Sequence, residues 1–338
     1  MGTKDLIKRI EKLEKHRKNI ENKNAAEQKL TSDQRNTVFI IGAGGSKPYG
    51  FPTGSELVTL IKQNLSDGAV IDQITKHFSK EVVESFLEKL HRQTILNIDK
   101  FLRNNSDSES FKQLGEFLIR STLQAIKPQY DTDSDWYAYV FDLLRNKAND
   151  KSDILNSKLY FITFNYDHVI EWSLRRLLLD FNFSFTADEV SAFLQEKVIH
   201  LYGSLDNFNL KTGQFRNNTD IIQSLNQQNG NTGKLYTVYD KKKNTSLTTS
   251  PGSILKKANL IYIVGFGFDA DNVELLKLNK LTSERKTDDP VILYIFDYSG
   301  TCKHQIGSLK PHWKNKNLAI NKLTVSSKKN ISGAFQQD

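Results

Sequence analysis

Short apolar runs, separated by longer segments with helical spacing, dominate the pattern of hydrophobic and polar positions along the chain. Each run is rich in Ile, Val, Tyr and Phe and is bounded by Gly, Asn or Asp, which is typical of strands buried on both faces. Continuous apolar strands that alternate with helices favour an α/β fold, in which helices flank a parallel sheet. The five expected strands are residues 38–41, 159–164, 198–202, 260–264 and 291–296.

The section between the first two expected strands has the spacing of helices. Apolar residues three and four positions apart lie on one face of a helix. We therefore expect a helical subdomain, residues 55–150, inserted into an α/β domain that spans residues 35–300. The apolar positions that carry this expectation are Val82, Val83, Phe86, Leu87 and Leu90, and further on Phe111, Leu114, Phe117 and Leu118.

Both ends of the chain are polar and basic. Residues 1–34 carry Leu6, Ile10 and Leu13 at a spacing of four and three, which is a narrow apolar stripe on a basic helix. This N-terminal extension is expected to contact another copy of the chain or a partner, with a frayed tail as the alternative. Residues 301–338 form a C-terminal basic segment, and residues 206–253 are predicted to be long loops with a hairpin around Gly233.

The composition excludes several classes of protein. Of 338 residues 38% are hydrophobic, which is enough for a substantial core. No apolar stretch approaches the roughly 18 residues that a membrane span needs. The single cysteine, Cys302, excludes an intrachain disulfide and a zinc site built from several thiolates. We therefore expect a cytoplasmic protein that makes no membrane contact and has neither zinc nor any other metal site.

The net charge of +8 raises the question of nucleic-acid binding. The basic residues are spread over several clusters along the chain, and no zinc finger or aromatic-basic ribonucleoprotein motif accompanies them. Charge by itself gives affinity for phosphate backbones. We expect only weak nucleic-acid contact.

A glycine-rich loop follows the first expected strand, in the stretch VFIIGAGGSKPYGFPTGSEL. Gly42, Gly44 and Gly45 remove side chains where the strand ends, so that backbone amides can approach a phosphate. Downstream, Thr53 and Glu56 form a capping box at the start of a helix. The loop does not match G-x-G-x-x-G, because position 47 is Lys. From the loop alone, dinucleotide binding and a tight structural turn both remain open.

Three further expected strands end in polar residues or glycine. His200 and Tyr202 lie two positions apart on one of them, so strand alternation puts both on one face. Because parallel strands present their carboxyl ends at one edge of a sheet, these residues are expected to share a crevice with the glycine loop. The strand-end residues are Asn165, Tyr166 and Asp167, then Gly203 and Ser204, and finally Gly265 and Gly267.

In this order the motifs resemble those of the SIR2 superfamily: Gly-Ala-Gly-x-Ser, x-Phe-Pro, Thr-x-Asn-Tyr-Asp, a His-containing segment ending in Gly-Ser, and Gly-x-Gly. The resemblance covers residues 42 to 272 and is closer to bacterial SIR2-like proteins of antiphage defence than to deacetylating sirtuins. It implies NAD as the substrate, bound across a Rossmann-like sheet. The cofactor-binding residues it implies are Gly42, Ala43, Gly44, Ser46, Phe51, Pro52, Thr163, Asp167, Gly203, Ser204, Gly265 and Gly267.

The resemblance also implies a reaction. Deacetylating sirtuins carry a four-cysteine zinc module, and its absence here favours hydrolysis of NAD to nicotinamide and linear or cyclic ADP-ribose. Asn165 is expected to orient the ribose or the attacking water, with a helix cap as the alternative role. The family's histidine position holds Tyr202, so His200 is the expected base and Tyr202 the alternative. His168 is expected to face outward from the following helix.

The resemblance finally implies a biological role. An enzyme that depletes NAD is toxic to its host, so we expect control by oligomerisation or by a partner such as a HerA-type ATPase or an Argonaute-like protein. Two alternatives remain: a catalytically silent subunit that binds NAD or ADP-ribose and regulates a partner, and a nucleic-acid-directed enzyme of the same defence system.

Overall fold

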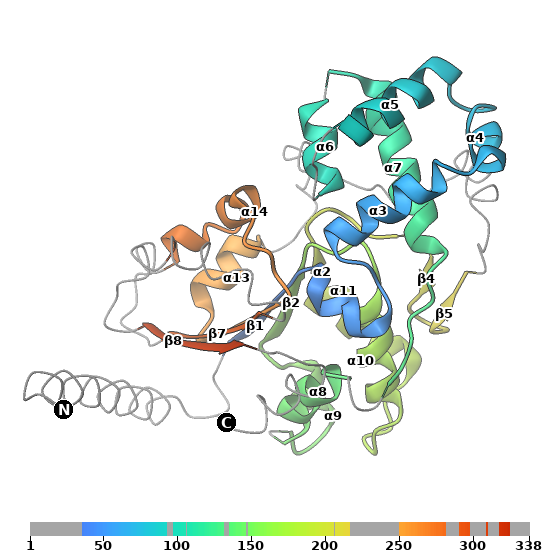
Figure 1. The fold of residues 1–338 in the computed structure, drawn as a ribbon. Coiled ribbons are helices and arrows are strands. Elements are labelled where there is room, and N and C mark those ends of the chain that lie inside the picture. The colour runs from blue at the N-terminus through green and yellow to red at the C-terminus, as the bar shows by residue number, and fades with distance from the viewer. Residues whose placement is uncertain are drawn as a thin grey trace, which may run out of the picture.

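The computed structural model describes residues 36–92, 97–105, 107–131, 135–146, 148–205, 207–216, 250–281, 291–297, 309 and 318–324. The N-terminal extension and the expected hairpin around Gly233 lie outside these residues. Within them, six strands form one parallel sheet in the order β3-β2-β1-β6-β7-β8 (Figure 1). The strands are β1 (Thr37–Ile41), β2 (Leu159–Thr163), β3 (Val198–His200), β6 (Leu260–Val264), β7 (Val291–Asp297) and β8 (Leu318–Thr324).

The order of the strands confirms the predicted α/β, Rossmann-like fold. From the central strand β1 the chain adds β2 and β3 on one side, and then β6, β7 and β8 on the other. Counted within the sheet, this is the order 3-2-1-4-5-6 of dinucleotide-binding folds, in which the direction of winding reverses between strands 1 and 4. Ligands of such sheets bind at the carboxyl ends of the strands at that switch point, here between β1 and β6.

The sixth strand is the one that the sequence did not predict. β8 pairs with β7 along its whole length, from Val291↔Leu318 to Asp297↔Thr324. In its sequence, LAINKLT, Asn and Lys interrupt the apolar residues. It therefore lacks the continuous apolar run that is expected of a strand buried on both faces. The sheet therefore extends past residue 300, the predicted end of the α/β domain.

An aromatic ladder crosses the middle of the sheet. Phe161, Phe39, Tyr262 and Tyr294 occupy one register on β2, β1, β6 and β7. Their rings stack in sequence, with centroids 5.4, 4.6 and 4.8 Å apart. Cross-strand aromatic pairs stabilise a sheet by up to about 1 kcal/mol each, so the ladder ties the four central strands together. Trp136 covers the ladder, since its ring stacks on Phe39.

Helices fill the long connection from β1 to β2, and those expected around residues 82–90 and 111–118 are present as α5 and α7. α3 packs against α5, α6 and α7, whereas α8 packs against α10 beside the sheet (Figure 1). The helices of this connection thus lie in two places, and a separate subdomain over residues 55–150 stays a prediction. They are α2 (Ala43–Ser46), η2 (Lys47–Tyr49), α3 (Gly54–Asn64), α4 (Gly68–Ile74), α5 (Lys80–Arg92), α6 (Ile98–Asn104), α7 (Glu109–Gln124), α8 (Tyr137–Arg145) and α9 (Lys151–Leu155).

The remaining helices follow the later strands. α10 and α11 connect β2 to β3, and α13 precedes β6. None of the described helices is long and apolar enough to cross a membrane. These elements are α10 (Val169–Leu179), α11 (Ala187–Lys197), α13 (Pro251–Lys257), α14 (Ala270–Leu275) and η3 (Leu278–Lys280), together with a small hairpin of β4 (Phe208–Asn209) and β5 (Gln214–Phe215).

Candidate functional site

The glycine loop packs directly on the loop that follows β6. The amide of Gly42 donates to the carbonyl of Val264 (3.0 Å), and the amide of Gly44 donates to the carbonyl of Gly265 (3.0 Å). A Cβ atom on Gly42 would lie 2.6 Å from the Gly265 oxygen, and one on Gly265 would lie 2.1 Å from the amide nitrogen of Gly45. The glycines are therefore required for this backbone-to-backbone contact at the switch point of the sheet.

This contact changes how the loop can serve a ligand. The amide of Gly45 donates to the carbonyl of Gly42 (2.8 Å), so the amides of all three glycines already bind backbone carbonyls. Their predicted role of approaching a phosphate is not available to these amides in this conformation. A phosphate at this edge has to be held by other groups of the two loops.

Asn165, just beyond β2, is fixed in a single orientation. Its side-chain nitrogen Nδ2 donates to the carbonyl of Gly42 (3.1 Å) and to Ser46 Oγ (2.9 Å). A backbone carbonyl can only accept, so the group that faces Gly42 must be the NH₂. The Asn165 amide nitrogen donates to Thr163 Oγ1 (3.0 Å), which itself donates to the carbonyl of Ile41 (3.3 Å).

The fixed orientation leaves one polar atom of Asn165 available. Both hydrogens of Nδ2 are used, and Oδ1 accepts no hydrogen bond from any residue that the structure describes. The residue is 7% exposed. Asn165 thus presents an oriented acceptor at the carboxyl edge of the sheet, beside the switch point.

Ser46 and Asp167 support this orientation of the Asn165 side chain through hydrogen bonds. Ser46 is fully buried, and its hydroxyl accepts from Asn165 and donates to Asp167 Oδ1 (3.0 Å). The same oxygen of Asp167 accepts from the amide of Val169 (3.1 Å) at the start of α10. Burial raises the pKa of Asp167, although these two hydrogen bonds partly oppose the rise. Ser46 has no surface for the predicted cofactor contact in this conformation, and Asp167 holds the first turn of α10 through the Val169 amide.

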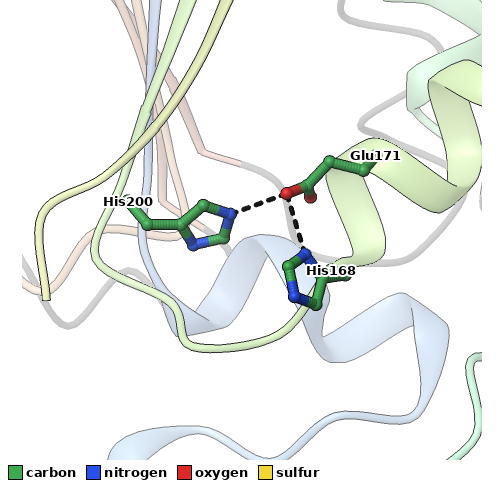
Figure 2. Close-up of side chains that lie close together, drawn as sticks. All are labelled: His168, Glu171 and His200. Atoms are coloured by element: carbon green, nitrogen blue, oxygen red, sulfur yellow. Dashed lines mark hydrogen bonds and ion pairs between the residues drawn. The ribbon is translucent and has the colours of Figure 1, made fainter. Parts of the chain in front are cut away.

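His200 ends β3 and is held at both ring nitrogens. Nδ1 lies 2.9 Å from the backbone oxygen of Asn165, and Nε2 lies 2.8 Å from Glu171 Oε1 on α10 (Figure 2). Both partners are hydrogen-bond acceptors, so both ring nitrogens of His200 are engaged in this arrangement. A base needs a nitrogen with a free lone pair, and His200 offers none in this arrangement. Its predicted role as the base therefore does not fit the geometry.

His168, at the N-cap of α10, approaches the same carboxylate oxygen. Its Nδ1 lies 2.9 Å from Glu171 Oε1, and its Nε2 contacts the backbone oxygen of Leu205 (Figure 2). Its side chain is 11% exposed, so the prediction that His168 faces outward is wrong. Its contacts with Glu171 and with the Leu205 carbonyl turn the ring inward.

Burial and charge act in opposite directions within this cluster of His168, Glu171 and His200. Burial would lower the pKa of His168, but Glu171 and the Leu205 carbonyl outweigh it and raise that pKa above its ordinary value. Burial would likewise raise the pKa of Glu171, but the two imidazoles hold it far below its ordinary value. The carboxylate is therefore ionised between two imidazoles.

Glu171 is a residue that the sequence analysis missed. Its signal is its position in α10, because Glu171, Leu174 and Leu178 lie three and four residues apart and share the buried stripe of the helix. A carboxylate in an apolar stripe needs partners. Those partners are two histidines that lie 3 residues before it and 29 residues after it in the chain.

Tyr202 faces a different part of the site from His200. β3 ends at His200, so strand alternation does not carry over to Tyr202, and the expectation of one shared face is wrong. The Tyr202 hydroxyl donates to Asn272 Oδ1 on α14. Burial, with Asp99 and Asp269 nearby, raises the pKa of Tyr202 well above its ordinary value. A tyrosine that stays protonated cannot serve as a base at neutral pH.

The helix α6 closes over this side of the sheet. Asp99 on α6 accepts from the Tyr166 hydroxyl (2.9 Å), and Arg103 on the same helix pairs with Asp271 on α14. Burial raises the pKa of Asp99, against the lowering effect of the Tyr166 hydrogen bond. The long connection after β1 therefore supplies one wall of the candidate site.

The other predicted residues are distributed around this edge. Thr163 is fully buried beneath Asn165, and Phe51 is buried after the glycine loop. Gly203 and Gly265 have positive φ (73° and 59°), whereas Gly267 is exposed and in open space. Partial exposure is shared by Ala43, Gly44, Pro52, Gly203, Ser204 and Gly265.

No protein-family model matches the chain, and a search of curated proteins finds no match. The structure joins Gly42, Ser46, Thr163, Asn165 and Asp167 in one hydrogen-bonded network and attaches His200 to it through the backbone of Asn165.

Proposed function

We propose that the chain binds NAD across the carboxyl edge of its sheet and hydrolyses the bond between nicotinamide and ribose. The observation that carries the proposal is the oriented side chain of Asn165 beside the switch point of a 3-2-1-4-5-6 sheet. A sheet of this order binds dinucleotides at that point in other folds. The resemblance of the motifs to SIR2-like proteins supports the choice of NAD among dinucleotides.

Asn165 would act by positioning. Its Oδ1 can accept a hydrogen bond from a ribose hydroxyl or from the attacking water, while Gly42 and Ser46 prevent the amide from turning. Holding the reactants in a near-attack geometry is worth several kcal/mol of the barrier, and a misplacement of 1 Å costs about 100-fold in rate. The supporting hydrogen bonds of Asn165 therefore matter as much as its own contact.

The reaction balances without a side-chain base. Water attacks the ribose carbon as its bond to nicotinamide breaks, the bonding electrons neutralise the cationic ring nitrogen, and the water gives up one proton. The products are ADP-ribose, nicotinamide and one proton, which passes to solvent. We assign no proton transfer to His200 or Tyr202, because each of them is engaged with an acceptor.

The biological setting is proposed from the resemblance alone. SIR2-like proteins of this kind deplete NAD during antiviral defence, so the same toxic role would follow here. Control by oligomerisation, or by a HerA-type ATPase or Argonaute-like partner, stays part of this proposal.

Nicotinamide release from NAD tests the proposal. The purified full-length chain is incubated with NAD, and nicotinamide is separated and quantified over time. We expect release by the wild type and a loss of at least about 100-fold in Asn165→Ala. Asn156→Ala, at an exposed asparagine that follows α9, is the control and should match the wild type. Equal release by Asn165→Ala and the wild type would refute the role of Asn165.

A second function is favoured by the same site. Neither His200 nor Tyr202 has a free basic atom, which fits a subunit that binds NAD or ADP-ribose without turnover and signals to a partner. Calorimetric binding of NAD that is weakened in Asn165→Ala, with no nicotinamide released, would identify this regulatory function. Absence of NAD binding by the wild type would refute both.

A further inference from the structure

The cluster of His168, Glu171 and His200 has the composition of a metal site. One side-chain ligand atom from each residue lies within 4.8 Å of the other two. Two imidazoles and one carboxylate form the ligand set of several zinc enzymes and of mononuclear iron sites. We propose that these three side chains bind one divalent transition-metal ion, through His168 Nδ1, His200 Nε2 and the Glu171 carboxylate.

The outer contacts of the two histidines fit this proposal. Ring nitrogens that bind a metal are oriented by a hydrogen bond from the other nitrogen, often to a backbone carbonyl. His200 Nδ1 has that bond to Asn165, and His168 Nε2 has it to Leu205. Both histidines therefore present the remaining nitrogen to the same point, beside Glu171 Oε1 (Figure 2).

Glu171 carries the observation that points to a missing ligand. Its side chain is almost completely buried, at 6% exposed, and its second oxygen, Oε2, has no hydrogen-bond partner among the described residues. An unsatisfied buried carboxylate oxygen costs about 1–3 kcal/mol or more. A metal bound by both oxygens, or a water held by that metal, would satisfy it.

The spacing of the ligand atoms is compatible with an ion. Tetrahedral ligands about 2.0 Å from zinc are about 3.3 Å apart. The 2.8 and 2.9 Å separations from Glu171 Oε1 therefore have to open by about half an ångström, and the two ring nitrogens, which lie within 4.8 Å of each other, have to reach the same spacing.

The position of the site suggests what the ion does. The cluster joins the end of β3 to the first turn of α10, and His200 also holds the backbone of Asn165. An ion there would fix the segment between β2 and α10 that carries Asn165 and Asp167. The metal proposal does not depend on NAD chemistry, since it concerns binding alone.

Zinc binding measured by calorimetry tests the proposal. The tag-free full-length chain is stripped with a chelator and titrated with Zn²⁺, with Mg²⁺ as the ion that such a nitrogen-rich site disfavours. Binding of Co²⁺ is followed by its visible absorption, which reports the ligand geometry. The variants are His168→Ala, His200→Ala and Glu171→Gln, the last of which preserves the side-chain volume. His77→Ala removes an exposed histidine and is the matched control.

We expect one Zn²⁺ per chain for the wild type and for His77→Ala, and an affinity lower by more than about 100-fold in each cluster variant, since even outer contacts are worth 10–100-fold. Circular dichroism of each variant establishes that the fold is retained. Wild-type affinity for Zn²⁺ equal to that of folded Glu171→Gln, or no binding of Zn²⁺ by the wild type at millimolar concentration, would overturn the proposal.

Discussion

Substitution of Gly265 by alanine should be among the most damaging single-methyl changes in the chain. The residue has a φ of 59°, a region that costs an L-residue about 1–2 kcal/mol. The added Cβ would also lie 2.1 and 2.3 Å from the backbone of Gly45 and Gly44. Overpacking of this kind destabilises the folded state by about 1–3 kcal/mol. The lower conformational entropy of alanine in the unfolded chain offsets about 0.4–1 kcal/mol of this loss. The expected net loss is about 2–4 kcal/mol.

Alanine substitutions at three other glycines separate the two causes of destabilisation, backbone strain and overpacking. Gly50 has a φ of 92° but meets only side-chain atoms of Gln129 at 3.5 Å or more, so Gly50→Ala should lose about 1 kcal/mol through strain. Gly42 has negative φ and a 2.6 Å contact with Gly265, so Gly42→Ala should lose about 1–2 kcal/mol through overpacking. Gly267 lies in open space, and Gly267→Ala should be neutral or slightly stabilising.

Urea unfolding followed by circular dichroism measures these differences. The order of stability should be Gly267→Ala, then Gly50→Ala and Gly42→Ala, then Gly265→Ala as the least stable. In thermal unfolding, each kcal/mol should appear as a Tm change of about 2–4 °C for a domain of 150–250 residues. A Gly265→Ala variant as stable as Gly267→Ala would show that the two loops do not pack as described.

Three further predictions concern two buried contacts and one partly buried ion pair. Trp136→Phe should destabilise the fold by about 1–3 kcal/mol in urea unfolding, because it leaves the Gly45 carbonyl without the indole donor at 2.9 Å. Trp172→Phe, at a half-buried tryptophan, is the comparison. Ser46→Ala should reduce nicotinamide release by about 10-fold or more with little change in NAD affinity, since it frees the Asn165 amide to turn; equal rates would contradict this positioning role. Lys151 and the Thr186 amide lower the pKa of Glu189 to about 2. The stabilising effect of the Glu189 carboxylate is therefore complete above the ordinary pKa of 4.5 and is lost as the pH falls toward 2. Glu189→Gln should lower the free energy of unfolding at pH 7 and progressively less below pH 4.5. A difference between variant and wild type that stays constant from pH 7 to pH 3 would contradict the assignment.

The sheet could be predicted because most of its strands can be recognised individually from their own sequence. Residues 38–41 and 260–264 are continuous apolar runs, and burial on both faces of a parallel sheet requires such runs. β8 escaped because Asn and Lys interrupt its sequence. Strand order also lay beyond prediction, because it depends on pairings such as Ile41 with Val264 that join residues far apart in the chain.

The site shows the same division. The predicted position of Asn165 and Asp167 beyond the end of a strand is correct, because polar residues that directly follow a buried apolar run mark the point where the strand ends. The glycines were expected to face a phosphate, whereas their amides bind a second loop that no local pattern reveals. The partners of His200 could not be predicted either, since a histidine is oriented by whatever acceptors the fold brings to it, here Glu171 and the backbone of Asn165.

The central place of β1 has a consequence for synthesis of the chain on the ribosome. β1 is made before the strands that pair with it, and its four apolar residues, Val38 to Ile41, are completely buried in the finished sheet. Its neighbour β6 lies more than 200 residues later, since Asn36 and Asn259, which pair just before the two strands, are 223 positions apart. At about 5–20 residues per second, β1 waits on the order of 10–45 s for that neighbour. Throughout this time one edge of the strand is open to other chains, so nascent or truncated forms that end before residue 260 should depend on chaperones to stay unaggregated.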